Sequence, residues 1–374
     1  MKVVVERDAL MKALHHAQCL IREGGRTGIE ALKNGNGHYI RITFANKKMK
    51  FSELVPADIS EVGAVTVKTK KIYNIVNGLE NGSRIELVAV DCDDMRLEIR
   101  CGRKEFIICA FALYFSGIQK DADLTTTFRI SPVNLKMLID NTSFVAGSDT
   151  SHYYLAGVYL HEIKQIDGAM LRAVATDGHC MACQDVPLPA GAEGMDGVII
   201  PKNALDVISS LLDEQTDDIE VNLSAHTIML NCQNWQFAAM LIPANYPDYI
   251  KVIPSNNDKV MEINSQNFRQ AIGRVKICAN GDYFLKILIR KGGVALDCRN
   301  SRGEAANEEI DAAYAGEEMM LPYNCIGFNY RYLQSILEKI PETVKISFSE
   351  NSKPVLLQGQ DVKDSLYVLM PMKM

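Results

Sequence analysis

The chain has 374 residues, of which 47% are hydrophobic and 23% are charged, and its formal net charge is −6. This composition is typical of a folded protein of two or three domains and excludes a disordered chain. The acidic balance argues against a simple basic nucleic-acid binder, unless positive charge gathers on one surface.

The charged residues Glu6, Arg7 and Asp8 follow so early that the apolar core of a signal peptide cannot form before them. No apolar run in the chain is long enough to span a bilayer. We therefore expect a cytoplasmic protein with no membrane association. Most of the ten cysteines lie within apolar, alternating stretches. In a cytoplasmic chain this placement predicts reduced thiols that pack in the core.

A strand followed by an amphipathic helix is predicted three times, over residues 3–20, 128–144 and 261–278. The apolar faces of these helices begin at Leu10, Leu135 and Phe268, so the pattern returns at nearly equal intervals along the chain. Each helix repeats apolar residues at i, i+3 and i+4, the pattern of a face that packs on a sheet.

A second set of helices recurs at a similar interval. Its stripes contain Ile72, Leu205 and Leu333, which are again spaced almost evenly. Alternating, strand-like segments follow each of them, at 84–90 and 95–109, at 218–242, and at 343–357 and 365–370. Three copies of one unit therefore fill the chain.

Polar joints at 118–127 and 254–259 separate the three copies. We predict an α+β fold of three tandem repeats, each with two helices on an antiparallel sheet. The predicted domains are 1–124, 125–257 and 258–374.

Basic residues concentrate on the predicted helices, whereas acidic residues cluster in loops and near strand ends. If the helices of all three repeats face one way, they form a mildly basic surface that holds phosphates without reading bases. The alternative is that these lysines and arginines are simply solvated. The basic residues are Lys12, His15, His16, Lys68, Lys70, Lys71, Lys136, Lys202, Arg269, Arg274, Lys276, Arg331 and Lys339.

The most specific local pattern lies at residues 171–183, where two alternating apolar stretches flank Asp177-Gly178. This pattern predicts a tight hairpin in which Gly178 takes a backbone angle that a side chain disfavours. His179 would stand at the exit of the turn, where it can face a surface pocket.

Five motifs, at 151–157, 172–179, 246–249, 328–333 and 367–374, closely resemble those of the bacterial DNA polymerase III beta subunit family, the sliding clamps. The resemblance covers the whole chain and is weakest in the first repeat. It implies a head-to-tail homodimer whose six domains close a ring, with helices lining the hole and sheets outside. It implies a processivity factor in DNA replication that encircles duplex DNA without sequence specificity, has no catalytic residues and needs no cofactor or metal.

The resemblance also assigns residues to DNA contact. They are Arg26, in a predicted loop, Lys70, Asp149, Tyr153, Tyr154 and Lys202. The two tyrosines can stack on unpaired template bases, although strand packing is an alternative for Tyr154. Asp149 stands where the family often has a neutral or basic residue.

A pocket between the middle and last domains is implied to receive short hydrophobic peptides, with Gln and Leu or Phe anchors, from the replicative polymerase, the clamp loader and repair proteins. Its residues here are Leu155, Thr176, Gly178, His179, Met181, Pro247, Val252, Val368, Met370, Pro371 and Met372. Methionines suit a groove that accepts several related peptides. Cys180 and Lys373 stand where the family commonly has arginines.

Ring closure is implied to bring the last strand of the first domain against the last domain of a second chain. The apolar contacts would be Phe106 and Ile108 with Ile277 and Cys278, and the rim pairs would join Arg96 and Arg103 to Glu304, Glu308 or Glu309.

Two alternatives remain open. His179, Cys180 and Cys183 could form a zinc or redox site, although cysteines three apart in a strand point to opposite faces. The first repeat departs most from the family pattern, which suits a specialised clamp as well as the main replicative one.

Overall fold

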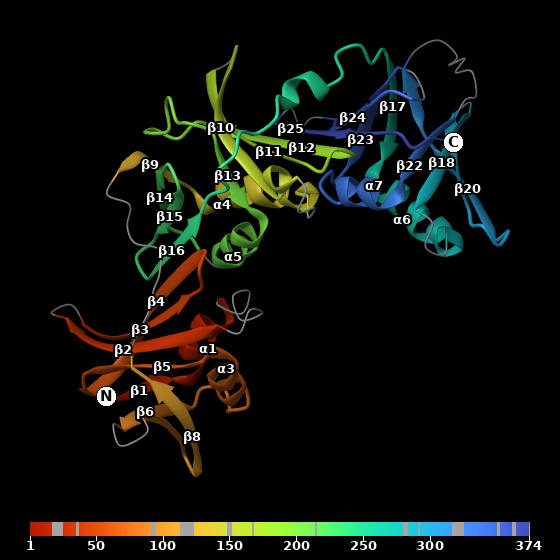
Figure 1. Cartoon of the computed structure of the whole chain (residues 1–374). Coiled ribbons are helices and arrows are strands. Elements are labelled where there is room, and N and C mark those ends of the chain that lie inside the picture. The colour runs from red at the N-terminus through yellow and green to blue at the C-terminus, as the bar shows by residue number, and fades with distance from the viewer. Residues whose placement is uncertain are drawn as a thin grey trace. The chain divides into compact units, whose positions relative to one another are not determined.

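Three successive segments of the chain share one order of elements: a strand, a helix, four strands, a second helix and three strands, with one short strand added before the second helix of the last segment. The computed structural model describes residues 1–16, 25–34, 37–90, 95–112, 123–147, 152–166, 168–213, 215–279, 283–290, 292–315, 325–349, 352–360 and 364–373 (Figure 1). The predicted threefold α+β repeat is thereby confirmed. Among the described residues, no helix is both long and apolar enough to cross a bilayer.

The strands of the first repeat form a closed sheet, because β1 pairs with β6 on one side and with β4 on the other. Its elements are β1 (Lys2–Glu6), α1 (Arg7–His16), β2 (Arg26–Asn34), β3 (Gly37–Ala45), β4 (Met49–Glu61), β5 (Gly63–Lys68), α3 (Thr69–Asn77), β6 (Arg84–Val90), β7 (Arg96–Cys101) and β8 (Lys104–Phe111). The predicted stripe of Leu10, Ala13 and Leu14 is fully buried.

The middle repeat follows with the same order. Its elements are β9 (Leu124–Ile130), α4 (Pro132–Asp140), β10 (Gly157–Gln165), β11 (Gly168–Thr176), β12 (Cys180–Pro187), β13 (Val198–Pro201), α5 (Lys202–Leu212), β14 (Ile219–Ser224), β15 (Thr227–Asn231) and β16 (Trp235–Met240), with short 3-10 turns η1 (Ser143–Val145), η2 (Tyr153–Leu155) and η3 (Tyr249–Val252). The joint predicted at 118–127 is wrong at its end, since β9 begins at Leu124 and pairs with β14.

The last repeat adds one short strand, β21. Its elements are β17 (Lys259–Asn264), α6 (Ser265–Val275), η4 (Lys276–Ala279), β18 (Phe284–Arg290), β19 (Gly293–Arg299), β20 (Ala305–Asp311), β21 (Ala313–Ala315), β22 (Cys325–Asn329), α7 (Tyr330–Leu337), β23 (Thr343–Phe348), β24 (Val355–Gly359) and β25 (Ser365–Leu369). Helices α6 and α7 begin after Asn264 and Asn329, whose side chains accept backbone N–H bonds as N-caps.

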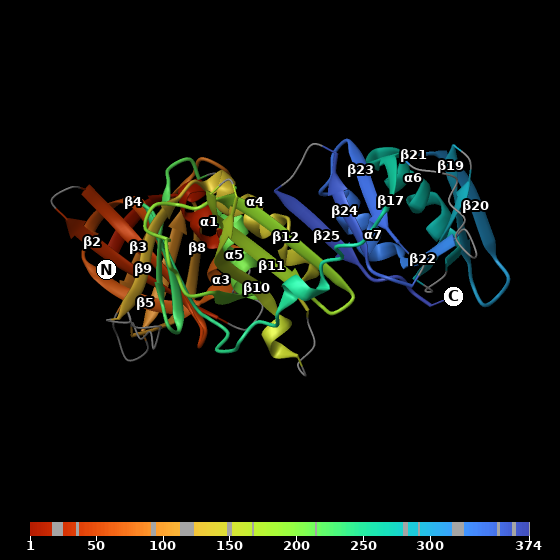
Figure 2. The ribbon, with the colours of Figure 1, turned by 90° about the horizontal axis from the view of Figure 1, so that it is seen from above.

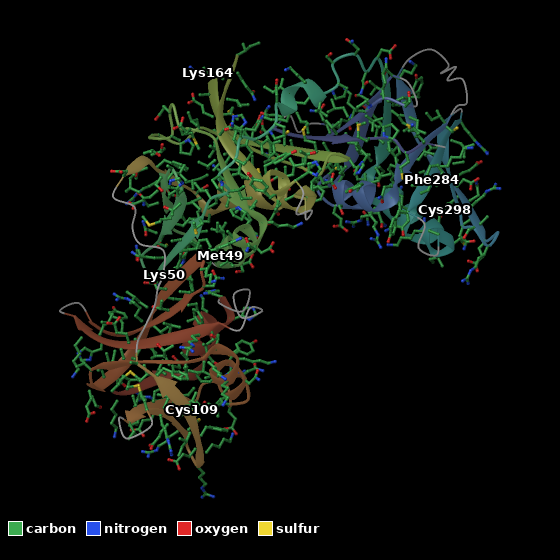
Figure 3. The ribbon with its side chains drawn as sticks, in the orientation of Figure 1. Met49, Lys50, Cys109, Lys164, Phe284 and Cys298 are labelled. Atoms are coloured by element: carbon green, nitrogen blue, oxygen red, sulfur yellow. The ribbon has the colours of Figure 1, made fainter. Side chains whose placement is uncertain are left out.

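Sheets run through the joints between repeats. In one sheet β4 of the first repeat pairs with β16 of the middle repeat, and Figure 3 labels Met49, which lies opposite Ala239 at this joint. In another sheet β12 of the middle repeat pairs with β25 of the last, side by side in both ribbon views (Figures 1 and 2). A third, four-stranded sheet has the order β20-β19-β18-β22 and leaves β20 at an edge.

The described chain forms two compact units, and their boundary passes through the middle repeat. The first comprises Met1–Lys136, Pro189–Met195 and Ile200–Ile242, and the second Met137–Leu188, Asp196–Ile199 and Pro243–Met374. Each sheet joint therefore lies within one unit: β4–β16 in the first and β12–β25 in the second. The domain limits expected after residues 124 and 257 stay predictions.

Candidate functional site

The hairpin that the sequence singles out connects β11 and β12 in the second unit. Gly178 has φ +89°, in the left-handed region that favours glycine. One Asp177 carboxylate oxygen accepts the N–H groups of His179 and Cys180, each at 2.9 Å, and Thr176 Oγ1 donates to the Cys180 carbonyl at 2.7 Å. The turn is thus fixed by its own side chains, and His179 is exposed at its exit, as predicted.

A second contact ties this turn to the last repeat. The Tyr332 hydroxyl, on α7, donates to the other carboxylate oxygen of Asp177. The backbone N–H of Met370 donates to the His179 carbonyl at 2.9 Å. The turn of the middle repeat is therefore held from two places in the last one.

One face of the sheet that joins the two repeats carries rows of apolar side chains. Strand register aligns Thr176, Met181 and Val368 in one row and Val174, Cys183 and Leu366 in the next. Because side chains two apart in a strand share a face, the two rows lie on the same side. Buried Val174, Met181, Cys183, Tyr249 and Val368 form one cluster, with Tyr159, Tyr246, Ile253, Leu356 and Leu366 packed against it.

Exposed apolar side chains lie next in sequence to this cluster. Ile250 is 62% exposed and Val252 47%, on the η3 turn that contributes Tyr249, whereas Met370 and Met372 are 37% and 39% exposed, just after Val368. Exposed methionine and branched aliphatic side chains beside a buried apolar cluster are typical of peptide-binding surfaces.

The C-terminal segment is held by its backbone. The N–H of Met372 donates to the carbonyl of Gly327 on β22 at 2.8 Å. A Cβ at residue 327 would overlap the Phe284 ring, so only glycine leaves room for this close approach. Met370, Pro371 and Met372 are consequently not a loose tail.

The predicted pocket residues fall into three classes. Gly178, His179, Pro247, Val252, Met370 and Met372 are exposed; Leu155, Thr176 and Pro371 are half-buried; Met181 and Val368 are each 2% exposed. The last two form the covered floor of the cluster rather than an open wall. Their role in peptide contact, like that of the others, stays a prediction.

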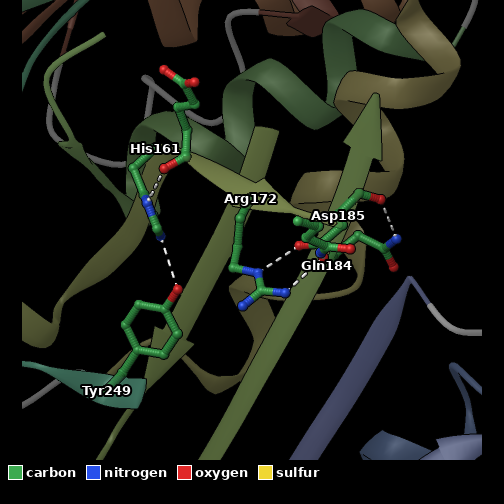
Figure 4. Close-up of polar contacts among 7 residues, drawn as sticks. His161, Arg172, Gln184, Asp185 and Tyr249 are labelled. Carbon is green, nitrogen blue, oxygen red and sulfur yellow. Dashed lines mark hydrogen bonds and ion pairs between the residues drawn. The ribbon is translucent and has the colours of Figure 1, made fainter. Parts of the chain in front are cut away.

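A polar network on the same sheet face holds the η3 turn (Figure 4). Register places His161, Arg172 and Asp185 side by side on β10, β11 and β12. Arg172 donates two hydrogen bonds to Asp185, at 2.6 and 2.7 Å, and these side chains are only 14% and 4% exposed. Burial raises the pKa of the Tyr249 hydroxyl, and the nearby Arg172 guanidinium acts in the opposite direction.

His161 completes this network and has a defined tautomer. Its Nδ1 lies 2.9 Å from the Glu162 carbonyl, which can only accept, so Nδ1 carries the proton. Its Nε2 therefore accepts from the Tyr249 hydroxyl, at 3.0 Å. Burial lowers the pKa of His161 below its usual value, and the nearby Arg172 guanidinium acts in the same direction.

Sequence reasoning missed this network and most of the aromatic cover of the cluster. Tyr246 stacks on Tyr159 with ring centroids 4.8 Å apart, and it anchors the segment that carries Pro247. The motif at 246–249 contains both tyrosines, Tyr246 and Tyr249, so their presence could have been noted. Their packing partners could be found only with the register of β10 to β12.

The zinc or redox alternative finds no support. Cys180 and Cys183 are both buried, at 2% and 1% exposure, and Cys183 shares its face with Val174 while Cys180 lies on the opposite one. Burial raises the pKa of the Cys183 thiol to about 12 and also raises the pKa of Cys180, which keeps both thiols protonated. In the described part of the chain, no group of three or more His, Cys, Asp or Glu residues could hold a metal.

Residues expected to contact DNA lie in both units. Arg26 opens strand β2 rather than standing in a loop, with its guanidinium 4.7 Å from the centre of the Phe111 ring. Lys70 is exposed on α3, and Lys202 is the first residue of α5. Tyr153 is 54% exposed and Tyr154 half-buried on the η2 turn, not on a strand. Asp149 lies outside the described residues.

Several of the helix cations are engaged by neighbours in the same unit. Lys136 pairs with Asp213 at 2.8 Å, and Lys276 donates to Gln334 at 3.1 Å. The Arg331 guanidinium lies 3.8 Å from the centre of the Tyr283 ring. Of these three side chains only Lys136 has its charge compensated by a carboxylate, while Lys276 and Arg331 keep their charge and are held in place by neutral groups.

The residues expected at the dimer contact have mixed exposure. Ile277 is 77% exposed, Cys278 and Phe106 are half-buried, and Ile108 is 8% exposed, while Arg96 and Arg103 are exposed. The three carboxylates expected to pair across the interface already have partners in their own chain: Glu304 with Asn300, Glu308 with Arg274 and Glu309 with Arg290.

We expect the His161 network to make stability depend on pH. A lowered pKa means that, below about pH 6.5, the unfolded chain binds more protons than the folded one, so stability falls as pH decreases from that value toward the folded pKa. His161→Gln removes this titration. The loss of melting temperature between pH 7.5 and pH 5.5 should be smaller in the variant than in the wild type.

His179→Gln is the matched control for that measurement, because His179 is exposed at the turn. Its loss of melting temperature should equal that of the wild type. If His161→Gln and the wild type respond equally to pH, the proton on His161 is not linked to folding.

Known proteins similar to this one match the whole chain. Three family models match in tandem: DNA polymerase III beta subunit, N-terminal domain, over residues 1–113; central domain, over 129–248; and C-terminal domain, over 250–373. The chain is 30% identical to the beta sliding clamp of Caulobacter vibrioides over 379 residues and 27% identical to that of Escherichia coli K12 over 383 residues, with 100% of each chain covered.

Solved structures agree with the fold. The crystal structure of the C. crescentus beta sliding clamp superposes with a TM-score of 0.91 at 28% identity, covering 100% of this chain and 99% of that one. The Bartonella birtlesii sliding clamp bound to griselimycin also gives a TM-score of 0.91, at 29% identity with 100% of both chains covered.

Proposed function

The chain belongs to the DNA polymerase III beta subunit family, and from this premise we propose that two copies close head to tail into a ring that encircles duplex DNA and tethers proteins through the cluster between β12 and β25. Members of this family are non-catalytic processivity factors of DNA replication. The ring, its DNA contacts and its peptide pocket in this chain are the proposal.

The observation that carries the ring is the pattern of strand joints. At both joints within the chain, the fourth strand of one repeat pairs with the last strand of the next repeat. These pairs are β4 with β16 and β12 with β25. The pattern leaves two strands over, the fourth of the last repeat, β20, and the last of the first repeat, β8. If the same rule applies once more, β20 pairs with β8 of a second copy and the chain of joints closes.

The incomplete burial of one aromatic side chain, Phe106 on β8, supports the joint between β20 and β8. Phe106, Phe237 and Tyr367 occupy the same place on the last strands of the three repeats, opposite Ile99, Leu230 and Leu357 in their hairpins. Phe237 is 1% exposed and Tyr367 is fully buried, because each lies at a joint; Phe106 is only half-buried. A partner strand would complete its burial, which is favourable in water.

The repeat also supplies a register for the new joint. Phe51 lies opposite Phe237, and Ala182 lies opposite Tyr367. The equivalent residue on β20 is Ala306, which places Phe106 of the second copy opposite it. Because the two strands would be antiparallel, Ile108 would then lie opposite Glu304, the residue just before β20.

Binding to DNA then needs little affinity, because a closed ring stays on the duplex by linkage. A net-acidic chain with a few exposed helix cations suits such sliding, since phosphate contacts carry no sequence information. Exposed Lys70 on α3 and the exposed Tyr153 ring are the best-placed of the predicted contacts.

Peptide tethering is supported by the cluster between β12 and β25 and by its exposed apolar neighbours. The solved clamps of Bartonella birtlesii and Pseudomonas aeruginosa bind griselimycin. We assign to this surface peptides with Gln and Leu or Phe anchors, which the replicative polymerase, the clamp loader and repair proteins would donate.

The ring predicts a dimer that depends on Phe106. Phe106→Asp places a charge at the joint and should convert a dimer into a monomer at micromolar concentration, as measured by sedimentation velocity. Ile166→Asp, at a fully exposed turn position of the middle repeat, should remain dimeric. A wild-type chain that sediments as a monomer throughout would contradict the ring.

Linkage to DNA predicts retention that depends on topology. Wild-type protein loaded onto nicked circular DNA by a clamp loader should co-elute with the circle in gel filtration and dissociate when the circle is cut once. The uncut circle is the control. Equal retention on circular and linear DNA would show that affinity, not encirclement, holds the protein.

The pocket predicts a loss of peptide affinity from one exposed side chain. Val252→Asp should weaken binding of a fluorescent peptide with Gln and Leu anchors by about tenfold or more, because it charges the apolar rim. Val62→Asp is the matched control, since Val62 is 59% exposed in the other unit. Truncation after Leu369 should abolish binding. Unchanged affinity in both altered proteins would refute the assignment.

A further inference from the structure

A polar side-chain pair recurs at one position in all three repeats. His16 Nδ1 lies 2.9 Å from a Glu53 carboxylate oxygen, and Asn141 donates to Gln184 at 2.8 Å. The single Nε–H of Arg274 is shared between the two Glu308 carboxylate oxygens, at 2.9 and 3.2 Å, and a terminal nitrogen donates a further hydrogen bond.

These positions are equivalent by the internal repeat. His16, Asn141 and Arg274 each follow, by the same number of positions, the residue that opens the apolar face of their repeat's first helix. Each lies at the end of, or just after, that helix. The partners also correspond: Glu53, Gln184 and Glu308 each stand three residues after the residue that closes a hairpin, Lys50, Met181 and Ala305.

Each pair connects the end of a helix to the fourth strand of its repeat, the strand that makes a joint. Glu53 lies opposite Trp235 in the β4–β16 joint, and Gln184 lies opposite Ser365 in the β12–β25 joint. Both are buried, at 9% and 2% exposure. The third pair joins Arg274 of α6 to Glu308 of β20, and these side chains are 57% and 25% exposed. Among the described residues, β20 has no partner strand beyond β19.

A sheet edge that must accept a second chain gains from being held in shape beforehand. Ordering a strand and its side chains at the moment of association costs free energy, and a strand already fixed to its own helix avoids part of that cost. β20 is bonded on one side, to β19. The Arg274–Glu308 pair fixes it to α6 from the sheet face.

We propose that Arg274 and Glu308 form a docking latch, an intrachain pair that presets β20 for addition of strand β8 from a second copy. The latch rests on the proposed head-to-tail dimer. It differs from the expectation that Glu308 pairs across the interface with Arg96 or Arg103, because it assigns Glu308 to its own chain. Arg274 and Glu308 are positioning residues in this assignment.

The other repeats provide the rescue variant. The middle repeat builds its latch from Asn141 and Gln184, so the double change Arg274→Asn with Glu308→Gln transplants that latch onto β20. Arg274→Ala and Glu308→Ala each remove one half. Arg299→Ala is the matched control. Arg299 and Asp297 both lie on β19, the strand next to β20, and form an ion pair at 3.0 Å.

The experiment measures the dimer dissociation constant of these proteins by sedimentation equilibrium, with melting temperature and peptide affinity as checks on folding. Each single alanine variant should weaken the dimer by about tenfold, and the transplanted pair should restore it to within about threefold of the wild type. Arg299→Ala should match the wild type, and all variants should melt alike and bind peptide alike.

Three outcomes would overturn the latch. One is a dimeric wild type with unchanged constants in both alanine variants. A second is weakening by Glu308→Ala but not by Arg274→Ala, which would place the partner of Glu308 on the other chain. The third is a double variant as weak as the singles. A wild type that never dimerises would instead overturn the ring itself, and the latch with it.

Discussion

Backbone hydrogen bonding at sheet edges is the constraint on which the rest of this structure depends. An edge strand exposes unpaired N–H and C=O groups, and a repeated domain has such an edge at each end. The chain satisfies them by pairing β4 with β16 and β12 with β25, so that consecutive repeats share sheets. Among the described residues, three repeats in series still leave β20 at an edge, and β8 pairs with β5 only at Ala110 and Phe111, so that its first residues have one neighbouring strand. A second copy can satisfy both at once, which makes closure by symmetry more economical than a separate cap.

The β12–β25 joint does a second task. Its register brings Met181 beside Val368, from different repeats, and neither could form the apolar cluster alone. The same joint ends at Leu369, so the segment that follows emerges beside the β11–β12 turn and is bonded to His179. The apolar surface to which we assign peptide binding therefore arises where two repeats meet, and its geometry is as rigid as the joint. The buried Arg172–Asp185 pair and Tyr249 extend that rigidity to the η3 turn.

Much of this architecture could be predicted from the sequence, because helices and hairpins are local. The stripe of Leu10, Ala13 and Leu14 and the turn at Gly178 follow from spacing and from one residue's backbone freedom. The network of His161, Arg172 and Asp185 could not be predicted, because its members are polar, distant in sequence and brought together only by strand register. The same limit applies to Met181 and Val368, whose alternation indicates a strand but not the tyrosines that cover it.

Charge placement agrees with the sliding ring that we propose. Cations that bound phosphates tightly would slow movement along DNA, whereas a surface of paired cations attracts the duplex weakly at any one place. In this chain Lys136 is paired with Asp213 and Arg274 with Glu308, so part of the helix charge serves internal contacts. The pairing of Arg274 has a consequence at the edge of the sheet as well. A charged pair loses more hydration on burial than the neutral Asn141–Gln184 pair. In the proposed dimer this cost offsets part of what the Arg274–Glu308 pair contributes by ordering β20 beforehand.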